Sequence, residues 1–443
     1  MYSTTLKRAL LLIFSILFVA SLKAAAQAGT LDPTFGKGGI FISNFKQSGN
    51  DSTFLNAVAI QSDGKILIGG STPASAAVVR LNTNGTLDAT FGVGGIANFG
   101  TAGVQAFAMV VQPDGKIVAA ASGDETGLVA RFNVDGSLDT TFGKGGIATP
   151  SSLISEPGVS NGLAVQPNGD ILLTGFGLMG RLTSAGQLDT SFGVGGFVPL
   201  ASQVVTAMTL QSDGKILVTT GAGAPTEILA PFSLAPTPQP GAIARYNANG
   251  SLDKTFGAAG QAACVASAAA LAIQSDGKIL VAGTIPSALL TDITSGRTFA
   301  ANQTGFGLVR YNSNGSIDTT FNGGIAITGF GRAFPAGNGF SLAIQSNGEI
   351  VVAGQAGALG ASLAFNLSSF ALARYTTTGK PDTTFGTKGT VITTIGQGNI
   401  SFVSALVVQG DGKIVAAGNS GPPPPSVGGQ YVPNFAIARY LGQ

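Results

Sequence analysis

The polar residues that could do chemistry in this 443-residue chain fall into three short motifs that recur in a fixed order. The first reads Leu-Asp-Pro-Thr-Phe-Gly-Lys-Gly-Gly at residues 31–39, the second reads Gln-Ser-Asp-Gly-Lys-Ile at 61–66, and the third is an apolar run that ends in Arg80. A repeated Asp could supply oxygen ligands to calcium, and a Gly-x-Gly-Gly loop could hold a phosphate. Each chemistry has to be weighed against a structural role for the same residues.

Two residue types that carry much of enzyme chemistry are absent or nearly so. The chain contains no His, which excludes a Ser-His-Asp triad, a Cys-His pair and a His metal ligand. The single cysteine, Cys264, cannot form an internal disulfide or a multi-thiolate zinc site, and we expect it to be a small buried side chain. Charged residues are only 10% of the chain and the net charge is +2, so no basic excess is present to bind nucleic acid.

Calcium and phosphate both fit the motifs poorly. Calcium takes about six to eight oxygens, usually from several carboxylates close together, whereas each copy of the first motif offers one Asp. No helix follows Gly-x-Gly-Gly to direct its N-terminus at an anion. The Phe of the first motif, such as Phe35, is expected to pack between sheets rather than to stack on a ligand. The sequence therefore predicts no cofactor and no metal.

The three motifs divide the chain into seven repeats. Successive Asp residues of the first motif are 50 to 65 residues apart. The repeated positions are Asp32, Asp88, Asp139, Asp189, Asp253, Asp318 and Asp382 in the first motif, and Arg80, Arg131, Arg181, Arg245, Arg310, Arg374 and Arg439 in the third. Such a regular period indicates a repeat architecture.

Each repeat reads as four short strands, which in the first repeat lie at about 39–44, 56–61, 65–70 and 77–82. These runs are rich in Val, Ile and Phe and are bounded by Gly, Asn, Asp and Pro, as strands are. Many are apolar on both faces, which is typical of sheets covered on both sides. The Asp-Gly of the second motif predicts a hairpin turn between two of the strands.

Seven such units joined by Gly-rich connectors predict an all-β, seven-bladed β-propeller with four antiparallel strands in each blade. A β-solenoid is the first alternative, but a unit of this length with an internal hairpin is long for one coil. An outer-membrane barrel is the second alternative, and the Arg in every fourth strand argues against the lipid-facing alternation that it needs.

The three motifs, Leu-Asp-x-Thr-Phe-Gly-x-Gly-Gly, Gln-x-Asp-Gly-Lys-Ile and Ala-Arg-Tyr, resemble the delta-60 repeat, a bacterial family of predicted β-propellers. The resemblance covers all seven repeats. It implies a secreted propeller, and it brings no established activity and no shared catalytic residues with it. The chain departs from WD repeats, since it has neither His nor Trp.

The N-terminal 28 residues have the form of a secretory signal peptide. Lys7 and Arg8 precede an apolar run at 9–22, and an alanine-rich segment follows it, so that cleavage after Ala26 or after Ala28 fits. Fourteen apolar residues are too few to span a bilayer, which needs about 20. We therefore expect one propeller domain at 29–443, without a transmembrane segment, exported to the periplasm, the cell surface or the medium. An uncleaved N-terminal anchor is the alternative.

Equal numbers of repeated Arg and Asp suggest that the two pair. We expect each Arg to place its fork of N–H groups on the carboxylate of a first-motif Asp, for example Arg80 on Asp88 and Arg439 on Asp32. The alternative is that the Arg extends to solvent while the Asp caps its own turn.

Strand direction alternates within a blade, so the Asp-Gly hairpins and the Leu-Asp connectors share one face, which we call the uniform face. The remaining loops share the opposite face, which we call the variable face, and they are long at 221–240, 284–304, 355–368 and 420–433. Function usually lies on loops of this kind. The candidate binding residues there are Glu227, Phe232, Asp292, Arg297, Phe299, Asn302, Asn366 and Tyr431.

Three functions remain open from the sequence. The first is a secreted, non-catalytic binding or scaffold module that engages a glycan, a cell-surface polymer or a protein through the variable face. The second is an extracellular hydrolase or lyase acting on polysaccharides, with a carboxylate pair on the variable face. The third is a purely structural surface module. Neither nucleic acid nor a catalytic residue is predicted.

Overall fold

The computed structural model describes residues 27–43, 45, 53–101, 104–123, 126–150, 162–175, 177–200, 205–220, 241–264, 267–286, 304–331, 336–357, 367–396, 399–424 and 431–443. Within these residues the fold is all-β, and its helical content is one turn of 3-10 helix, η2 (Asn322–Gly324). Over the same ranges, no helix is long and apolar enough to cross a membrane.

The described strands form antiparallel groups of four, which we call blades. The first strands of the blades are β2 (Leu55–Ile60), β6 (Gln105–Val111), β10 (Leu163–Val165), β14 (Val205–Leu210), β18 (Ser267–Ile273), β22 (Ala336–Ile344) and β26 (Ile400–Val408). The second strands are β3 (Ile66–Ser71), β7 (Ile117–Gly123), β11 (Ile171–Gly175), β15 (Ile216–Thr220), β19 (Ile279–Pro286), β23 (Ile350–Gly357) and β27 (Ile414–Gly421).

The other half of each blade completes the sheet. The third strands are β4 (Ala76–Leu81), β8 (Thr126–Phe132), β12 (Leu178–Leu182), β16 (Ala242–Tyr246), β20 (Thr304–Tyr311), β24 (Ser368–Tyr375) and β28 (Asn434–Tyr440). The fourth strands are β5 (Ile96–Phe99), β9 (Ile147–Ala148), β13 (Phe197–Pro199), β17 (Gln261–Ala263), β21 (Ile325–Thr328), β25 (Thr390–Thr393) and β1 (Ile40–Ile42). Blades are named by chain order, from the first (β2–β5) to the last (β26–β28 with β1).

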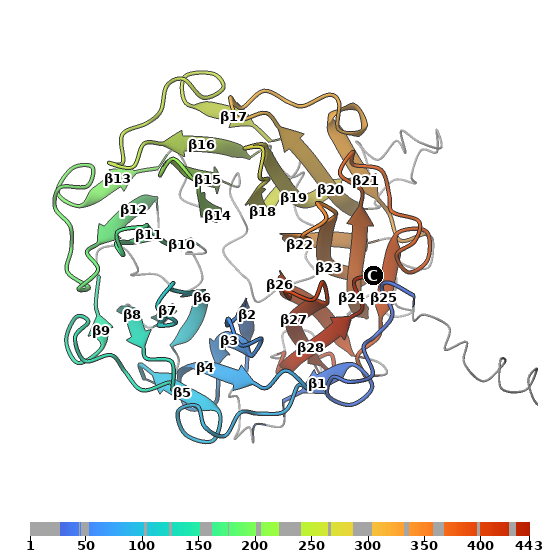
Figure 1. Ribbon diagram of the computed structural model, residues 1–443, viewed down its shortest axis with the longest axis horizontal. Helices are drawn as coiled ribbons and strands as arrows, with labels where there is room; N and C mark the ends of the chain where they lie inside the picture. The colour runs from blue at the N-terminus through green and yellow to red at the C-terminus, as the bar shows by residue number, and fades with distance from the viewer. Residues whose placement is uncertain are drawn as a thin grey trace, which may run out of the picture.

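The blades are arranged in a ring, with the first strands nearest the centre and the fourth strands at the outside (Figure 1). Four blades are separate sheets, and the other three are joined into one twelve-stranded sheet by single parallel bridges, Thr304 to Ala336 and Ser368 to Ile400. Neighbouring first strands contact each other, as β2 does with β6 and with β26.

The N-terminal strand closes the ring by pairing with the C-terminal blade. Strand β1 lies antiparallel to β28, with Phe41 opposite Ile437. The outermost strand of the last blade therefore comes from the start of the chain, while its three inner strands come from the end. The hydrophobic cluster between this blade and the first one contains Ile68 and Val79 on one side and Val415 and Ile437 on the other.

The sequence-based division into repeats is wrong by one strand. It placed the strand after Gly-x-Gly-Gly at the start of a new unit, whereas β5 pairs with β4 of its own blade, and the other fourth strands do the same. The reason is the tight turn made by the connector, in which Lys37 N donates to Ile40 O and Gly39 N donates to Phe35 O. This turn reverses the chain onto the same sheet, so the crossing to the next blade follows the fourth strand.

The core consists of apolar layers between neighbouring blades rather than one central cluster. The second strands are buried along their whole length in most blades, as β3 is, and the third strands are buried along most of theirs. One layer, for example, joins Leu67 and Val78 of the first blade to Ala106 and Ile117 of the second. This arrangement explains why so many strands are apolar on both faces.

A β-bulge interrupts most of the first strands at the same place. The pairing of first and second strands shifts by one residue around Asn56, Phe107, Thr206, Ala269, Phe340 and Ser404. The bulge brings a carbonyl of the first strand against the second strand. A Cβ added at Gly354 would lie 1.9 Å from Asn338 O, so only glycine fits there.

We predict that Gly354→Ala destabilises the protein by about 1–3 kcal/mol, because the bulge carbonyl would have to move to admit the methyl group. Gly410→Ala is the matched control, since a Cβ there meets no atom within 4 Å. Denaturant unfolding of both variants checks this expectation. Equal midpoints for the two variants would contradict it.

Candidate functional site

Each described blade holds a repeated Arg against a repeated Asp on the uniform face. In the first blade, Arg80 Nε lies 2.8 Å from Asp88 Oδ2, and both side chains are buried. The equivalent distances are 2.7 to 2.9 Å for Arg131–Asp139, Arg181–Asp189, Arg245–Asp253, Arg310–Asp318, Arg374–Asp382 and Arg439–Asp32. The last of these pairs joins residues from opposite ends of the chain.

The two carboxylate oxygens of each Asp have different hydrogen-bond partners. In the first blade, Asp88 Oδ2 accepts from Arg80, whereas Asp88 Oδ1 accepts from the hydroxyl of Thr90 at 2.7 Å and from its backbone N–H at 3.1 Å. The ion pair and the turn cap, which the sequence left as alternatives, therefore occur together. The Arg contacts one carboxylate oxygen, in some blades with two of its nitrogens, as Arg439 Nε and Nη2 do with Asp32 Oδ2, because the turn occupies the other oxygen.

Each Arg also connects its blade to the next one. Arg131 Nη1 donates to the carbonyl oxygen of Ser184 in the third blade at 2.6 Å, and its guanidinium lies 4.8 Å from the centre of the Phe142 ring. The other six arginines stack on Phe91, Phe192, Phe256, Phe321, Phe385 and Phe35 in the same way. The repeated Phe therefore acts as a packing residue beneath the Arg.

Five blades add the Lys of the hairpin turn to this cluster. Lys65 Nζ, for example, lies 3.0 Å from Asp88 Oδ2. Two blades have an acidic residue at the Lys position, and its carboxylate turns to the Arg instead, with Glu349 Oε2 3.2 Å from Arg374 Nη1 and Asp170 Oδ2 3.9 Å from Arg181 Nε. The side chain at this position thus pairs with whichever member of the Arg–Asp pair carries the opposite charge.

The cluster keeps its carboxylates ionised. Burial raises the pKa of Asp88, but hydrogen bonds from Thr90 and Lys65 and the charge of Arg80 outweigh it and hold the pKa well below its usual range. The hydroxyl of Thr255, with the charge of Arg245, lowers the pKa of Asp253 to about 2. Such carboxylates remain charged at neutral pH and are unsuited to act as general acids.

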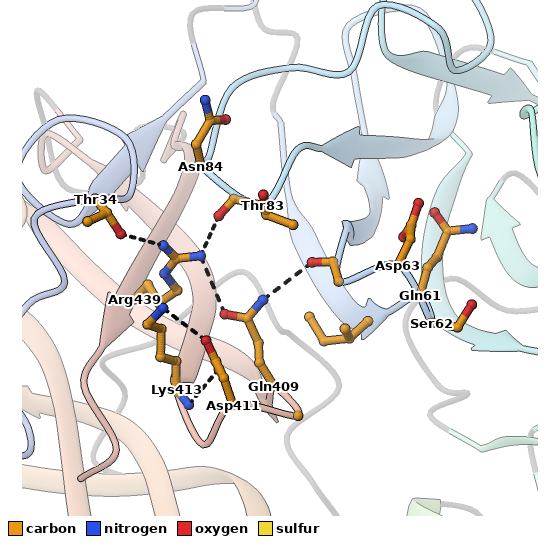
Figure 2. A pocket seen from close by; sticks show the side chains of 13 residues that line it. Thr34, Gln61, Ser62, Asp63, Thr83, Asn84, Gln409, Asp411, Lys413 and Arg439 are labelled. Carbon is orange, nitrogen blue, oxygen red and sulfur yellow. Dashed lines mark hydrogen bonds and ion pairs between the residues drawn. The ribbon is translucent and has the colours of Figure 1, made fainter.

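A pocket opens on the uniform face where the last blade meets the first (Figure 2). Its volume is about 570 Å³, and it lies between two hairpins, at 61–64 and 409–413, and the turn residues Thr83 and Asn84. Thr34, Ile60 and Arg439 complete the lining. The pocket therefore sits at the point where the ring closes.

Each charged side chain of this pocket has an ion-pair partner, either in the lining or beside it. Lys413 Nζ lies 3.5 Å from Asp32 Oδ2, which is outside the lining. Within the lining, Lys413 Nζ lies 2.9 Å from Asp411 Oδ2, and Arg439 donates to Thr83 O (Figure 2). Gln409 Nε2 bridges the two hairpins by donating to Gly64 O at 3.3 Å. Balanced charges with hydroxyl and amide groups suit a neutral polar ligand better than an ion. In the part of the chain that the structure describes, no three Asp, Glu or Cys side chains form a metal-binding group.

One of the predicted binding residues, Tyr431, is described, and it belongs to an aromatic cluster on the variable face. Its ring centre lies 6.4 Å from those of Phe54 and Phe402, at the ends of β2 and β26 that are remote from the hairpins. The Tyr431 hydroxyl donates to Ile400 O at 2.6 Å, and burial raises its pKa. The other predicted binding residues, Glu227, Phe232, Asp292, Arg297, Phe299, Asn302 and Asn366, lie outside the described residues.

Sequence reasoning missed Phe54 and Phe402, as well as the bulges beside them. A signal for the bulges was present, because Gly70 and Gly418 interrupt otherwise apolar strands, and glycine inside a strand often marks a bulge. Cys264 lies in the layer between the fourth and fifth blades, and burial raises the pKa of its thiol to about 12, so it is a protonated packing residue.

We predict that Asp253→Asn lowers the free energy of unfolding at pH 7 by about 3 kcal/mol, because it leaves Arg245 buried without its charge partner. The folded pKa of Asp253, about 2, is below the unfolded value of about 3.9. Its ionised form therefore stabilises the fold fully above about pH 4, and this contribution is lost as the pH falls through about 2.

The difference between the wild type and Asp253→Asn should accordingly shrink between pH 4 and pH 2, as measured by thermal or denaturant unfolding. Asp276→Asn serves as control, since Asp276 is an exposed hairpin residue whose counterparts in two other blades are already Asn168 and Asn347. An equally large loss in both variants would show that the buried pair has no special role.

Comparison with known proteins agrees with this architecture. Residues 61–91, 112–142, 238–256, 293–321 and 345–385 match the family described as "Domain of unknown function (DUF5122) beta-propeller". These segments contain hairpins, third strands and Leu-Asp connectors, the parts of the repeat that carry its three motifs. A comparison with curated proteins finds no match.

Several solved structures are similar to this chain at low sequence identity. A virginiamycin B lyase from Staphylococcus aureus is 13% identical, with 90% of this chain and 98% of that one covered and a TM-score of 0.47. A chain of the Drosophila complex of Plexin A with Semaphorin 1b is 10% identical, with 94% of this chain and 88% of that one covered and a TM-score of 0.46. A gluconolactonase from Xanthomonas campestris is 14% identical, with 73% of this chain and 82% of that one covered and a TM-score of 0.35. Similarities this weak carry no argument about function. The four-stranded blades and the matched repeats together identify the chain as a β-propeller repeat protein.

Proposed function

We propose that the described blades are the seven blades of one closed propeller, preceded by a secretory signal peptide, and that the exported propeller is a non-catalytic binding module. Its motifs resemble the delta-60 repeat of secreted bacterial propellers. The protein would act in the periplasm, at the cell surface or in the medium. Its partner would be a glycan, a cell-surface polymer or a protein, engaged by the loops of the variable face.

The observation that carries this proposal is that the repeated charged residues bind each other and hold the blades together. On the uniform face, each repeated Arg lies between an Asp, a Phe and the turn of the neighbouring blade, and all of these arginines except the half-buried Arg181 are buried. These groups repeat from blade to blade and hold the ring together, so they offer nothing specific to a partner. Recognition then falls to the opposite face, where the repeats differ from each other.

The variable face also presents apolar side chains near the centre of the ring. Phe54, Phe402 and Tyr431 form one cluster there, and Phe340 is 36% exposed at the bulge of β22. Aromatic side chains are common anchors in binding surfaces because they bury a large area with little loss of conformational freedom. The cluster lies where a partner held by the surrounding loops would meet the ring.

The binding hypothesis is tested with the exported protein on a glycan array and in pull-down experiments with cell-surface material. We expect a variant with 221–240 and 287–303 shortened to lose binding, and Tyr431→Ala to weaken it about tenfold or more, as for a buried aromatic anchor. Tyr431→Phe is the matched control for the ring. Each variant must keep the wild-type thermal midpoint.

Unchanged binding by the loop-shortened variant would reject the variable face as the binding surface. Loss of binding on mutation of the exposed uniform-face residues Ser62 and Asn84, with the loops intact, would instead assign recognition to the pocket at the ring closure.

The alternative is an extracellular polysaccharide hydrolase or lyase with a carboxylate pair on the variable face, for which Glu227 and Asp292 are the candidates. A general acid needs a raised pKa, whereas every described Asp with a shifted pKa has it lowered. Polysaccharide cleavage by the wild type that is lost in Glu227→Gln or Asp292→Asn would favour the enzyme over the binding module.

A further inference from the structure

The turn between the third strand and the Leu-Asp connector has the same hydrogen bonds from blade to blade. In the first blade, Asn82 N donates to Thr86 O at 2.8 Å, Gly85 N donates to Asn82 O at 2.9 Å, and Asp88 N donates to Arg80 O at 2.9 Å. One continuous segment, 80–88, supplies all of these groups. The turn fixes the Arg and the Asp of the buried ion pair relative to each other.

The last blade builds the same turn from two segments at opposite ends of the chain. Leu441 N donates to Thr30 O at 2.9 Å, Gly29 N donates to Leu441 O at 2.8 Å, and Asp32 N donates to Arg439 O at 2.8 Å. Leu441 thus takes the place of Asn82, and Gly29 takes the place of Gly85. The C-terminal segment therefore supplies the turn up to the position of Thr83, and the N-terminal segment supplies it from the position of Asn84 onward.

Ala28 is an integral part of this turn. It takes the place of Asn84, its side chain is 7% exposed, and it packs in the same apolar cluster as Phe385. Its carbonyl oxygen accepts from Gly386 N at 2.8 Å, as Asn84 O accepts from Gly36 N at 2.8 Å at another junction. Removing Ala28 would therefore remove the only link of this kind between the sixth blade and the last blade among the described residues.

Gln27 is attached to the same junction. Its carbonyl oxygen accepts from Thr30 N at 3.0 Å and from the Thr30 hydroxyl at 2.7 Å, and its side-chain amide donates to Gly386 O at 2.7 Å. Gly29 follows Ala28 and has φ of +86°, and a Cβ added there would lie 2.9 Å from Gly386 N. A side chain at this position would therefore be strained. Gln27 and Ala28, which precede the boundary expected at Gly29, therefore both contact the propeller.

We propose that the leader is cut between Ala26 and Gln27, so that Gln27 and Ala28 remain in the mature protein and complete the last blade. This inference rests on the proposed export of the chain. Peptide-bond hydrolysis with one water would leave the new carboxylate on Ala26 and the new amino group on Gln27. Ala24 and Ala26 provide the small residues that such a site requires. A cut after Ala28 uses the same kind of site but discards a buried part of the ring.

The test uses the full chain expressed in a secreting host, with peptide mass spectrometry of the exported protein. We expect the N-terminal peptide to begin at Gln27, with or without loss of ammonia from an N-terminal glutamine. A peptide that begins at Gly29 overturns the assignment of the cut while leaving export intact. Full-length protein retained in the cells overturns both the cut and the export on which it rests.

A pair of substitutions in the full chain provides a second test by the size of the product. Ala26→Leu places a large residue just before the proposed cut, and we expect the precursor to accumulate at least tenfold. Ala28→Leu is the matched control, and processing before Gln27 should continue, since cleavage precedes folding of the exported chain. Accumulation of the precursor in Ala28→Leu would overturn the proposal, because Ala28 directly precedes the alternative cut and lies outside the site that the proposal assigns.

Discussion

The ring depends on one carboxylate in each blade that has two partners at once and that is buried in every described blade except the third, where Asp189 is half-buried. One oxygen of Asp88 holds the turn that starts its own connector, and the other holds Arg80, which reaches across to the turn of the next blade. The position of the Asp therefore determines both the path of the chain within a blade and the attachment of that blade to its neighbour. Displacing it would disturb two sheets.

A buried ion pair by itself contributes little to stability, because the cost of removing both charges from water offsets their attraction. Here the surrounding groups change the balance. The remaining Arg N–H groups have oxygen partners, such as the Thr90 hydroxyl and the Val134 carbonyl, and the face of the guanidinium rests on Phe91. The network thus defines the angle between blades, which the apolar layers alone, being non-directional, would leave less well determined.

Much of this arrangement could be predicted from the sequence, because its causes are local and repeated. The Asp-Gly hairpins, the apolar strands and the pairing of Arg80 with Asp88 all follow from motifs within one repeat. The strand that follows Gly39 was assigned to the wrong unit, since a repeating sequence has the same period wherever a unit is taken to begin. The pairing of the fourth strands, such as β5 with β4 and β1 with β28, decides where a blade starts.

The candidate binding surface was less predictable than the scaffold. Tyr431 could be chosen as an exposed aromatic on a loop, but its neighbours Phe54 and Phe402 come from β-strand ends far away in the sequence. Contacts of this kind depend on how neighbouring blades are placed and have no local pattern. The pocket beside Arg439 could not be predicted either, because the residues that line it come from the first and last repeats.

The ring closes between the two ends of the chain, so a polypeptide can complete the fold only if it contains both β1 and β28. Arg439 and Asp32 lie 407 positions apart, so the segment synthesised first has no partner until the last strand has been made. Until then the first blade leaves an apolar face uncovered and β28 lacks its partner strand β1, and unpaired strand edges of this kind pair readily with other chains. A product shortened at either end would keep those edges exposed and be recognisable as incomplete to proteases. Such late closure would suit the proposed export, in which the chain stays unfolded while it crosses a membrane.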